Sequence, residues 1–110
     1  MKIGVISDTH IPDRAKDIPK EILDEFKNVD MIIHVGDLVD LGVLKKLMTV
    51  CNNVRAVWGN MDPMEVRNKL PEKEVIEIGN YKIGIMHGYG PPHKLIELLT
   101  FVFKNDNVIF

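Results

Sequence analysis

Three short apolar runs alternate with two helical patterns in the first 60 residues, and this alternation most constrains the fold. The runs are Ile3 to Ile6, Met31 to Val35 and Val54 to Trp58, and each has the length of a buried strand. The second helical pattern places its apolar residues at Leu41, Leu44, Leu47 and Met48. A strand–helix–strand order favours parallel strands joined by right-handed crossovers. The sequence therefore predicts an α/β fold.

The pattern changes in the second half of the chain. The stretch Pro63 to Lys73 is polar and contains Pro71, which predicts a long surface loop. Alternating apolar residues then flank Gly79-Asn80, which favours a hairpin with a type II′ turn. Leucines with helical spacing predict another helix after Gly90, and Asn107 to Phe110 predicts the start of a further strand.

Polar side chains follow four of the predicted strands. The carboxyl ends of parallel strands meet at one edge of a sheet, and open α/β sheets form their sites there. These side chains are therefore expected to converge if the second hairpin strand runs with the parallel ones. They are Asp8, His10, Asp37, Asn60 and His87.

Two carboxylates, two imidazoles and a carboxamide at one point indicate a metal site. Crowding two carboxylates raises the pKa of one of them unless a cation is present. Mixed nitrogen and oxygen ligands suit Mn²⁺, Fe²⁺ or Zn²⁺ better than Ca²⁺. The structural alternatives are that Asp8 caps a turn, that His10 is an ordinary loop residue, and that Asp37 and Asn60 are turn residues.

Other polar residues have a mainly structural interpretation. Asp62 is predicted to be a turn residue, and His34, inside an apolar strand, a hydrogen-bonded core histidine. Cys51 follows an apolar helical pattern and is predicted to be a small half-buried residue. Four residues that could contact a phosphate are interpreted as surface residues: Arg14, Arg67, Tyr89 and His93.

The ordered motifs DxH, GD, GN and HG, each closing a strand, resemble those of the calcineurin-like metallophosphoesterases. The likeness covers Lys2 to Phe110 and is closest to the small single-domain phosphodiesterases. It implies an αββα sandwich, in which two stacked mixed sheets are flanked by helices, with residues 1–110 forming part of a single domain.

The resemblance also implies roles for the polar residues. Asp8 and His10 would bind one metal, Asp37 would bridge two metals, and Asn60 and His87 would bind the second. A bridging water or hydroxide would attack the phosphorus of a small phosphodiester or nucleotide. The implied cofactors are two divalent ions, Mn²⁺ first, with Zn²⁺, Fe²⁺, Ni²⁺ and Mg²⁺ as alternatives.

Two departures from the family pattern stand out. The family's next motif, GHxH, follows a strand similar to Val108-Ile109-Phe110 and gives one further histidine to each metal. Either the chain is incomplete before this motif, which we expect, or the site lacks those ligands. The absence of this motif raises the possibility that residues 1–110 are inactive alone. Met61 stands where some members carry a histidine that protonates the leaving group. Activity should therefore favour phosphodiesters with good leaving groups, or be slow.

A second interpretation is a non-catalytic scaffold that binds protein partners. The run Asp8 to Pro19 also resembles a retromer coat subunit with this fold. A formal net charge of −2 argues against broad binding of nucleic acid. The single cysteine fits a reducing compartment, and no segment resembles a signal peptide or membrane span, so we expect a cytoplasmic protein without membrane contact. The sequence indicates no oligomeric state.

Overall fold

The computed structural model describes residues 1–12 and 16–108, and its elements follow the predicted order. The strands are β1 Ile3–Ile6, β2 Met31–His34, β3 Val54–Ala56, β4 Lys73–Ile78 and β5 Tyr81–Met86. The helices are α1 Lys20–Phe26, α2 Gly42–Met48, α3 Met64–Arg67, the 3₁₀ helix η1 Pro92–Lys94 and α4 Leu95–Val102.

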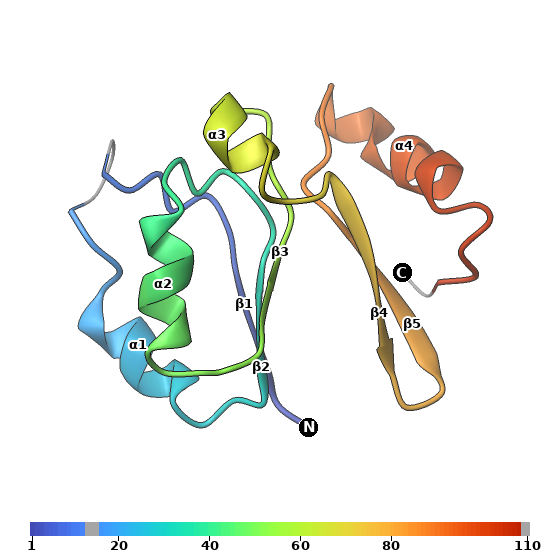
Figure 1. Ribbon diagram of the computed structural model, residues 1–110. Coiled ribbons are helices and arrows are strands. Elements are labelled where there is room, and N and C mark those ends of the chain that lie inside the picture. The colour runs from blue at the N-terminus through green and yellow to red at the C-terminus, as the bar shows by residue number, and fades with distance from the viewer. Residues whose placement is uncertain (13–15, 109–110) are drawn as a thin grey trace.

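The first sheet is parallel and has the strand order β1-β2-β3. Ile3 pairs with Met31 and Ile32 pairs with Val54, so the carboxyl ends of the three strands lie at the same edge. Helices α1 and α2 cover one face of this sheet (Figure 1). This confirms the parallel α/β unit predicted from the alternating patterns.

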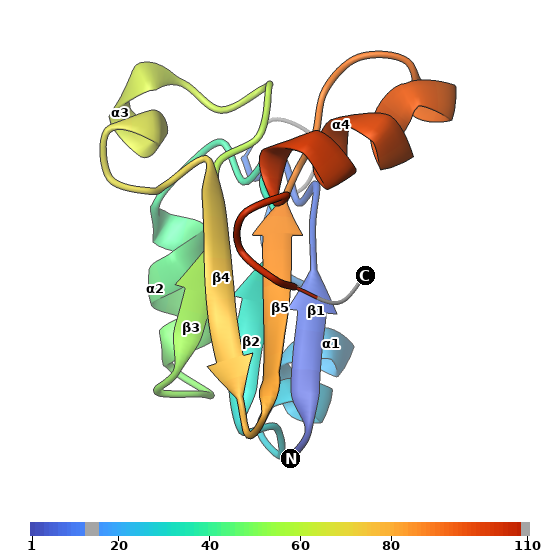
Figure 2. The same ribbon diagram turned by 90° about the vertical axis from the view of Figure 1, so that its right-hand side faces the viewer.

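The second sheet is the antiparallel hairpin β4–β5, which lies against the other face of the first sheet (Figure 1). Gly79 begins the two-residue connection with φ +58°, the positive value that a type II′ turn needs at this position. Figure 2 shows β5 running in the same direction as β1, β2 and β3. The end of β5 therefore reaches the edge where the parallel strands end.

Two apolar cores separate the layers. Alternate residues of β2 point to opposite faces, as strand geometry requires, so neighbouring residues enter different cores. Ile32 packs with Leu44 and Leu47 of α2, whereas Met31 and Ile33 pack with the second sheet. On the outer face of the hairpin, the buried ring of Phe103 covers Gly84, and α4 completes the layer (Figure 1). The arrangement is the αββα sandwich that the family resemblance implied.

Two local predictions differ from the structure. Pro63 to Lys73 was expected to be a loop, but it contains α3 and the first residue of β4. Pro63 has extended backbone angles directly before the helix, and its carbonyl accepts the Val66 and Arg67 N–H groups. Of the strand predicted at 107–110, Asn107 lies in a turn and Val108 in no regular element, while residues 109 and 110 lie outside the described range. Among the helices that the structure describes, none combines the length and apolar character needed to cross a bilayer.

Candidate metal centre

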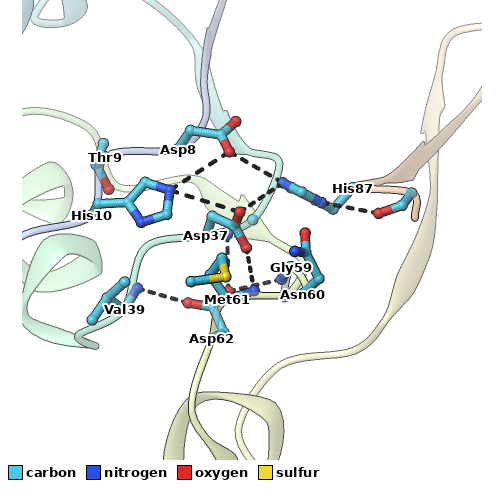
Figure 3. Close-up of polar contacts among 12 residues, drawn as sticks. Asp8, Thr9, His10, Asp37, Val39, Gly59, Asn60, Met61, Asp62 and His87 are labelled. Atoms are coloured by element: carbon cyan, nitrogen blue, oxygen red, sulfur yellow. Dashed lines mark hydrogen bonds and ion pairs between the residues drawn. The ribbon is translucent and has the colours of Figure 1, made fainter. Parts of the chain in front are cut away.

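The five residues predicted to converge come from loops that the structure brings to one edge of the sandwich. Asp8 and His10 follow β1, Asp37 follows β2, Asn60 follows β3 and His87 follows β5. Figure 3 shows the side chains of Asp8, His10 and His87 directed toward Asp37, with Asn60 beside them. Residues that are up to 79 positions apart in the chain thus form one cluster.

Three side chains form the tightest part of this cluster. The Nε2 atom of His87 lies 3.2 Å from Asp8 Oδ1 and 3.2 Å from Asp37 Oδ2. One ligand atom from each of Asp8, Asp37 and His87 lies within 4.8 Å of the other two, a spacing that a single metal ion can bridge. His10 Nε2 approaches the same oxygens at 3.8 Å and 3.7 Å, so His10 joins the cluster from the other side.

The cluster has a buried side and a solvent-exposed side. The side chains of His10 and Asp37 are 6 % and 5 % exposed, whereas that of Asp8 is 51 % exposed. Asn60 is exposed, and its side chain has no hydrogen bond to any of the residues that the structure describes. The carboxamide of Asn60 is therefore available to a ligand at the open side of the cluster.

The carboxylate of Asp62 holds the loops after β2 and β3 together. Its Oδ2 atom accepts the N–H groups of Asp37 at 2.9 Å and Gly59 at 2.7 Å, and Oδ1 accepts that of Val39 at 2.6 Å. Asp62 is buried, and its own N–H donates to the Gly59 carbonyl at 3.0 Å. Hydrogen bonds to a charged acceptor are among the strongest in proteins, so this carboxylate fixes the backbone that presents Asp37.

The backbone of Gly59 lies directly against Asp37. Its Oδ1 atom accepts the Met61 N–H at 2.8 Å, which turns Oδ2 toward His10 and His87. A Cβ atom added to Gly59 would overlap Asp37 Oδ1 and lie 2.6 Å from the Asp37 nitrogen. Glycine at position 59 is therefore required for this approach.

The backbone at the strand ends adopts uncommon angles. Asp8, His10 and Asp37 have φ values of +54°, +47° and +58°, in the left-handed region that aspartate and histidine tolerate better than most residues. Val39 has φ +73°, a genuine outlier for a β-branched residue. Backbone strain of this kind is typical of functional sites, and here the bond from Val39 N–H to Asp62 helps to hold it.

The electrostatics of the cluster favour opposite charges on His87 and Asp8. Partial burial alone would lower the pKa of His87, but the Gly88 carbonyl and the Asp8 and Asp37 carboxylates outweigh it, and the pKa is raised. Burial would likewise raise the pKa of Asp8, but the Ser7 hydroxyl and His87 outweigh it, and that pKa is lowered. At neutral pH, the pair therefore holds a negative carboxylate beside an imidazole that gains a proton readily.

His34 is the hydrogen-bonded core histidine that its place in an apolar strand predicted. It is fully buried, its Nδ1 accepts the Gly36 N–H at 3.2 Å, and its Nε2 lies 3.1 Å from the Thr9 hydroxyl. Burial lowers the pKa of His34 to about 4, although Asp62 and Asp8 act in the opposite direction. The neutral ring thus links the loops after β1 and β2 from beneath the cluster.

The remaining candidates lie around this centre or away from it. Arg67 was interpreted as a surface residue, but it donates from Nε to the Asp62 carbonyl and from Nη2 to the Asn60 carbonyl, each at 2.9 Å. The sequence missed this role because no local pattern marks a side chain that bonds distant backbone carbonyls. Tyr89 and His93 are exposed, and Arg14 lies outside the described residues. Cys51 is more deeply buried than predicted.

The donor set fits a divalent cation of the borderline class. Two carboxylate oxygens and an imidazole nitrogen suit Mn²⁺, Fe²⁺ or Zn²⁺. The Nδ1 atom of His87 lies 3.1 Å from the Gly88 carbonyl, an arrangement that directs the Nε2 lone pair of the neutral ring toward Asp8 and Asp37. A metal ion at Nε2 would take the place of a proton shared with the carboxylates. The geometry therefore supports a metal ligand set without assigning each residue to an ion.

The family model and the similar proteins of known sequence point to the same family. The model of the calcineurin-like phosphoesterase superfamily domain matches residues 1–110. Probable metallophosphoesterase MJ0623 from Methanocaldococcus jannaschii is 52% identical over 88 residues, which are 80% of this chain and 43% of that protein. Phosphodiesterase MJ0936 from the same organism is 35% identical over 102 residues, covering 81% of this chain and 60% of that protein.

A solved structure supports the fold. Vps29 from Entamoeba histolytica, a vacuolar protein sorting protein crystallised as a zinc complex, superposes with a TM-score of 0.73 at 32% identity. The match covers 94% of this chain and 59% of that one. The chain spans 43% and 50% of the first two curated relatives that it matches, about half of their length.

Proposed function

This chain belongs to the calcineurin-like phosphoesterase superfamily, and on that premise we propose that the protein is a metal-dependent phosphodiesterase. Proteins of this family bind divalent metals, and the observation that carries the proposal is the convergence of Asp8, Asp37 and His87 within 4.8 Å. The proposed ligands are Asp8, His10, Asp37, Asn60 and His87. Two ions are proposed, with Mn²⁺ as the first candidate, and the substrates are small phosphodiesters or nucleotides.

The residues around the proposed ions have different roles. A bound divalent cation would supply an activated water at neutral pH and would offset negative charge on the phosphoryl oxygens. Asp37, fixed by the Met61 and Asp62 contacts, holds its free oxygen toward both histidines. The exposed Asp8 and Asn60 border the open side, where a phosphate can enter. Hydrolysis would form a bond between the water oxygen and phosphorus and break the bond from phosphorus to the leaving oxygen. The attacking water would lose a proton to solvent, and the departing oxygen would take one up from solvent.

The choice of leaving group follows from position 61. Met61 is 55% exposed next to Asp37, and its thioether cannot donate a proton. The proposed enzyme therefore prefers phosphodiesters whose leaving group is stable as an anion. This is consistent with a phosphodiesterase that lacks a general acid at this position.

Hydrolysis of bis(4-nitrophenyl) phosphate by the full-length protein, with and without Mn²⁺, tests the proposal. We expect a rate well above that of the metal alone and a loss of more than about a hundredfold in Asp37→Ala, because even supporting residues of metal ligands cost up to that factor. Asp30→Ala is the matched control, since Asp30 is exposed and precedes β2, at the opposite end of the strand from Asp37. A rate that Asp37→Ala leaves unchanged would contradict the proposal.

A partner-binding scaffold of the same fold is the second candidate. The resemblance of Asp8 to Pro19 to a retromer subunit and the similarity to Vps29 favour it. Exposed apolar side chains such as Ile96 and Phe101, which are 81% and 67% exposed, would suit such a role. Calorimetric titration with Mn²⁺ and Zn²⁺ separates the candidates: weak metal binding together with no hydrolysis would favour the scaffold.

A further inference from the structure

We propose that a cavity beside the metal centre is a subsite for a flat aromatic group attached to the substrate phosphate, an inference that rests on the proposed function. The cavity has a volume of about 310 Å³, at the lower end of the range of small-molecule sites. Asn60 and His87 line one side of it and also belong to the candidate metal centre. A phosphate held at that centre would therefore carry one of its substituents into this cavity.

The other walls of the cavity are mainly aromatic or apolar. They are formed by Trp58 after β3, Met86 at the end of β5 and Tyr89 in the following loop. Trp58 is partly buried, and its backbone N–H donates to the Pro71 carbonyl at 3.0 Å, which ties the segment after β3 to the segment before β4. Rings of tryptophan and tyrosine bind flat π-systems by stacking, at low cost in conformational entropy.

Arg67 gives the cavity a rigid, positively charged wall. Its guanidinium group lies 4.6 Å from the centroid of the Trp58 ring. The two hydrogen bonds to the carbonyls of Asn60 and Asp62 prevent it from swinging away. Figure 1 shows α3, which ends at Arg67, at the same end of the molecule as the loops after β3 and β5. The planar cation lines the cavity that would receive the substituent of the anionic ester.

This combination favours an aromatic substituent over an alkyl or lipid chain. A lipid chain would require an extended apolar channel, whereas here charged Arg67 and Glu72 border a short cavity. The exposed Glu72 carboxylate can accept N–H groups from a ligand, as the exocyclic amine of a nucleobase would offer. A simple aryl ester and a nucleotide share the flat ring and differ in this donor and in the ribose, so a variant of Glu72 is needed to assign the difference.

The test measures dissociation constants of phosphate monoesters for the Mn²⁺-loaded full-length protein by calorimetry. Phenyl phosphate and adenosine 5′-monophosphate are compared with methyl phosphate, which has the same charged group but no ring. We expect the aromatic esters to bind about tenfold more tightly, within the range that stacking on one aromatic side chain supplies. Tighter binding of both aromatic esters indicates recognition of the ring, and additional affinity of the nucleotide that Glu72→Ala removes indicates a contact with Glu72.

Two variants localise the effect, and a third serves as a matched control. Tyr89→Ala should remove most of the preference for the ring without unfolding the protein, because Tyr89 is 58% exposed in a loop. Tyr81→Ala removes the other tyrosine of the chain, which is 63% exposed in the hairpin, and should leave the preference intact. The aromatic esters should quench the tryptophan fluorescence of the wild type, because Trp58 is the one tryptophan in these 110 residues. Trp58→Phe should lose this quenching and keep the preference for the ring.

The outcomes distinguish this inference from the proposed function. Equal affinity for methyl and aromatic esters, or a preference that survives Tyr89→Ala, overturns the aromatic subsite even if bis(4-nitrophenyl) phosphate is hydrolysed. Quenching that persists in Trp58→Phe places the ring elsewhere and also overturns it. Conversely, a preference that Tyr89→Ala removes, in a protein that hydrolyses no phosphodiester, supports the subsite and contradicts the enzyme.

Discussion

Replacing Asp62 by asparagine should weaken both the fold and the metal centre, although Asp62 itself is not proposed as a ligand. The carboxylate accepts three backbone N–H groups, from Asp37, Val39 and Gly59. Asparagine has the same shape but one acceptor oxygen, and its NH₂ group would face at least one of these donors. One charge-assisted bond lost from a buried site costs about 1.5–3 kcal/mol, and a buried N–H without a partner adds to that cost.

We therefore expect Asp62→Asn to lower the free energy of unfolding by about 2–4 kcal/mol, a large part of the 5–15 kcal/mol typical of a domain. Urea denaturation at neutral pH, followed by circular dichroism, measures this change. Titration with Mn²⁺ should show weaker binding, because the freed backbone no longer presents Asp37 at a fixed position.

The matched control is Asp30→Asn, since Asp30 also accepts a backbone N–H, that of Lys2 at 2.8 Å, but is exposed. Its cost should stay below about 1 kcal/mol, as for an ordinary surface hydrogen bond. If the two variants are equally stable, or if Asp62→Asn binds Mn²⁺ as tightly as the wild type, the carboxylate does not organise the centre.

Three further predictions concern single residues. The free energy of unfolding should fall by up to about 3 kcal/mol as the pH drops from about 6.5 to 4, because His34 binds a proton in the unfolded chain but its pKa is about 4 in the folded protein. Urea titrations at several pH values measure this dependence, and His34→Gln should reduce it. Gly59→Ala should abolish Mn²⁺ binding in calorimetry, because its Cβ would overlap Asp37, whereas Gly79→Ala, with open space around the added carbon, should keep binding and lose about 1 kcal/mol of stability. Met61→His should raise kcat for phosphodiesters with poor leaving groups by about tenfold or more, because an imidazole can protonate the departing oxygen, and should leave 4-nitrophenyl esters nearly unchanged in the same steady-state assay; equal effects on both ester types would contradict a missing general acid.

The sequence predicted the layers well because burial leaves a strong pattern. The β-branched run of β2 and the helical spacing of α2 reflect buried faces, and Gly79-Asn80 encodes its turn locally. The short helix α3 was missed, since four residues contain too little of a helical period to stand out. Its position depends on Val66 entering the core, which is a tertiary contact.

The candidate site could be predicted by residue type and place, but not by its connections. Asp8, Asp37 and His87 stand at strand ends, so the fold alone brings them together. The support from Asp62 and Arg67 depends on backbone groups of distant residues, for which the sequence has no periodic or compositional sign. Asp62 was correctly assigned a structural role, but the number of its partners was not foreseen.

The contact between His87 and Asp8 spans 79 positions and joins the two sheets across the sandwich. The cluster cannot form within either sheet alone, so it is completed only after the hairpin has docked on the parallel strands. A cation bound there would cross-link the two sheets, and its binding free energy would oppose their separation. Slower amide hydrogen exchange in β4 and β5 upon addition of Mn²⁺, with little change in α1, would be the signature of this coupling.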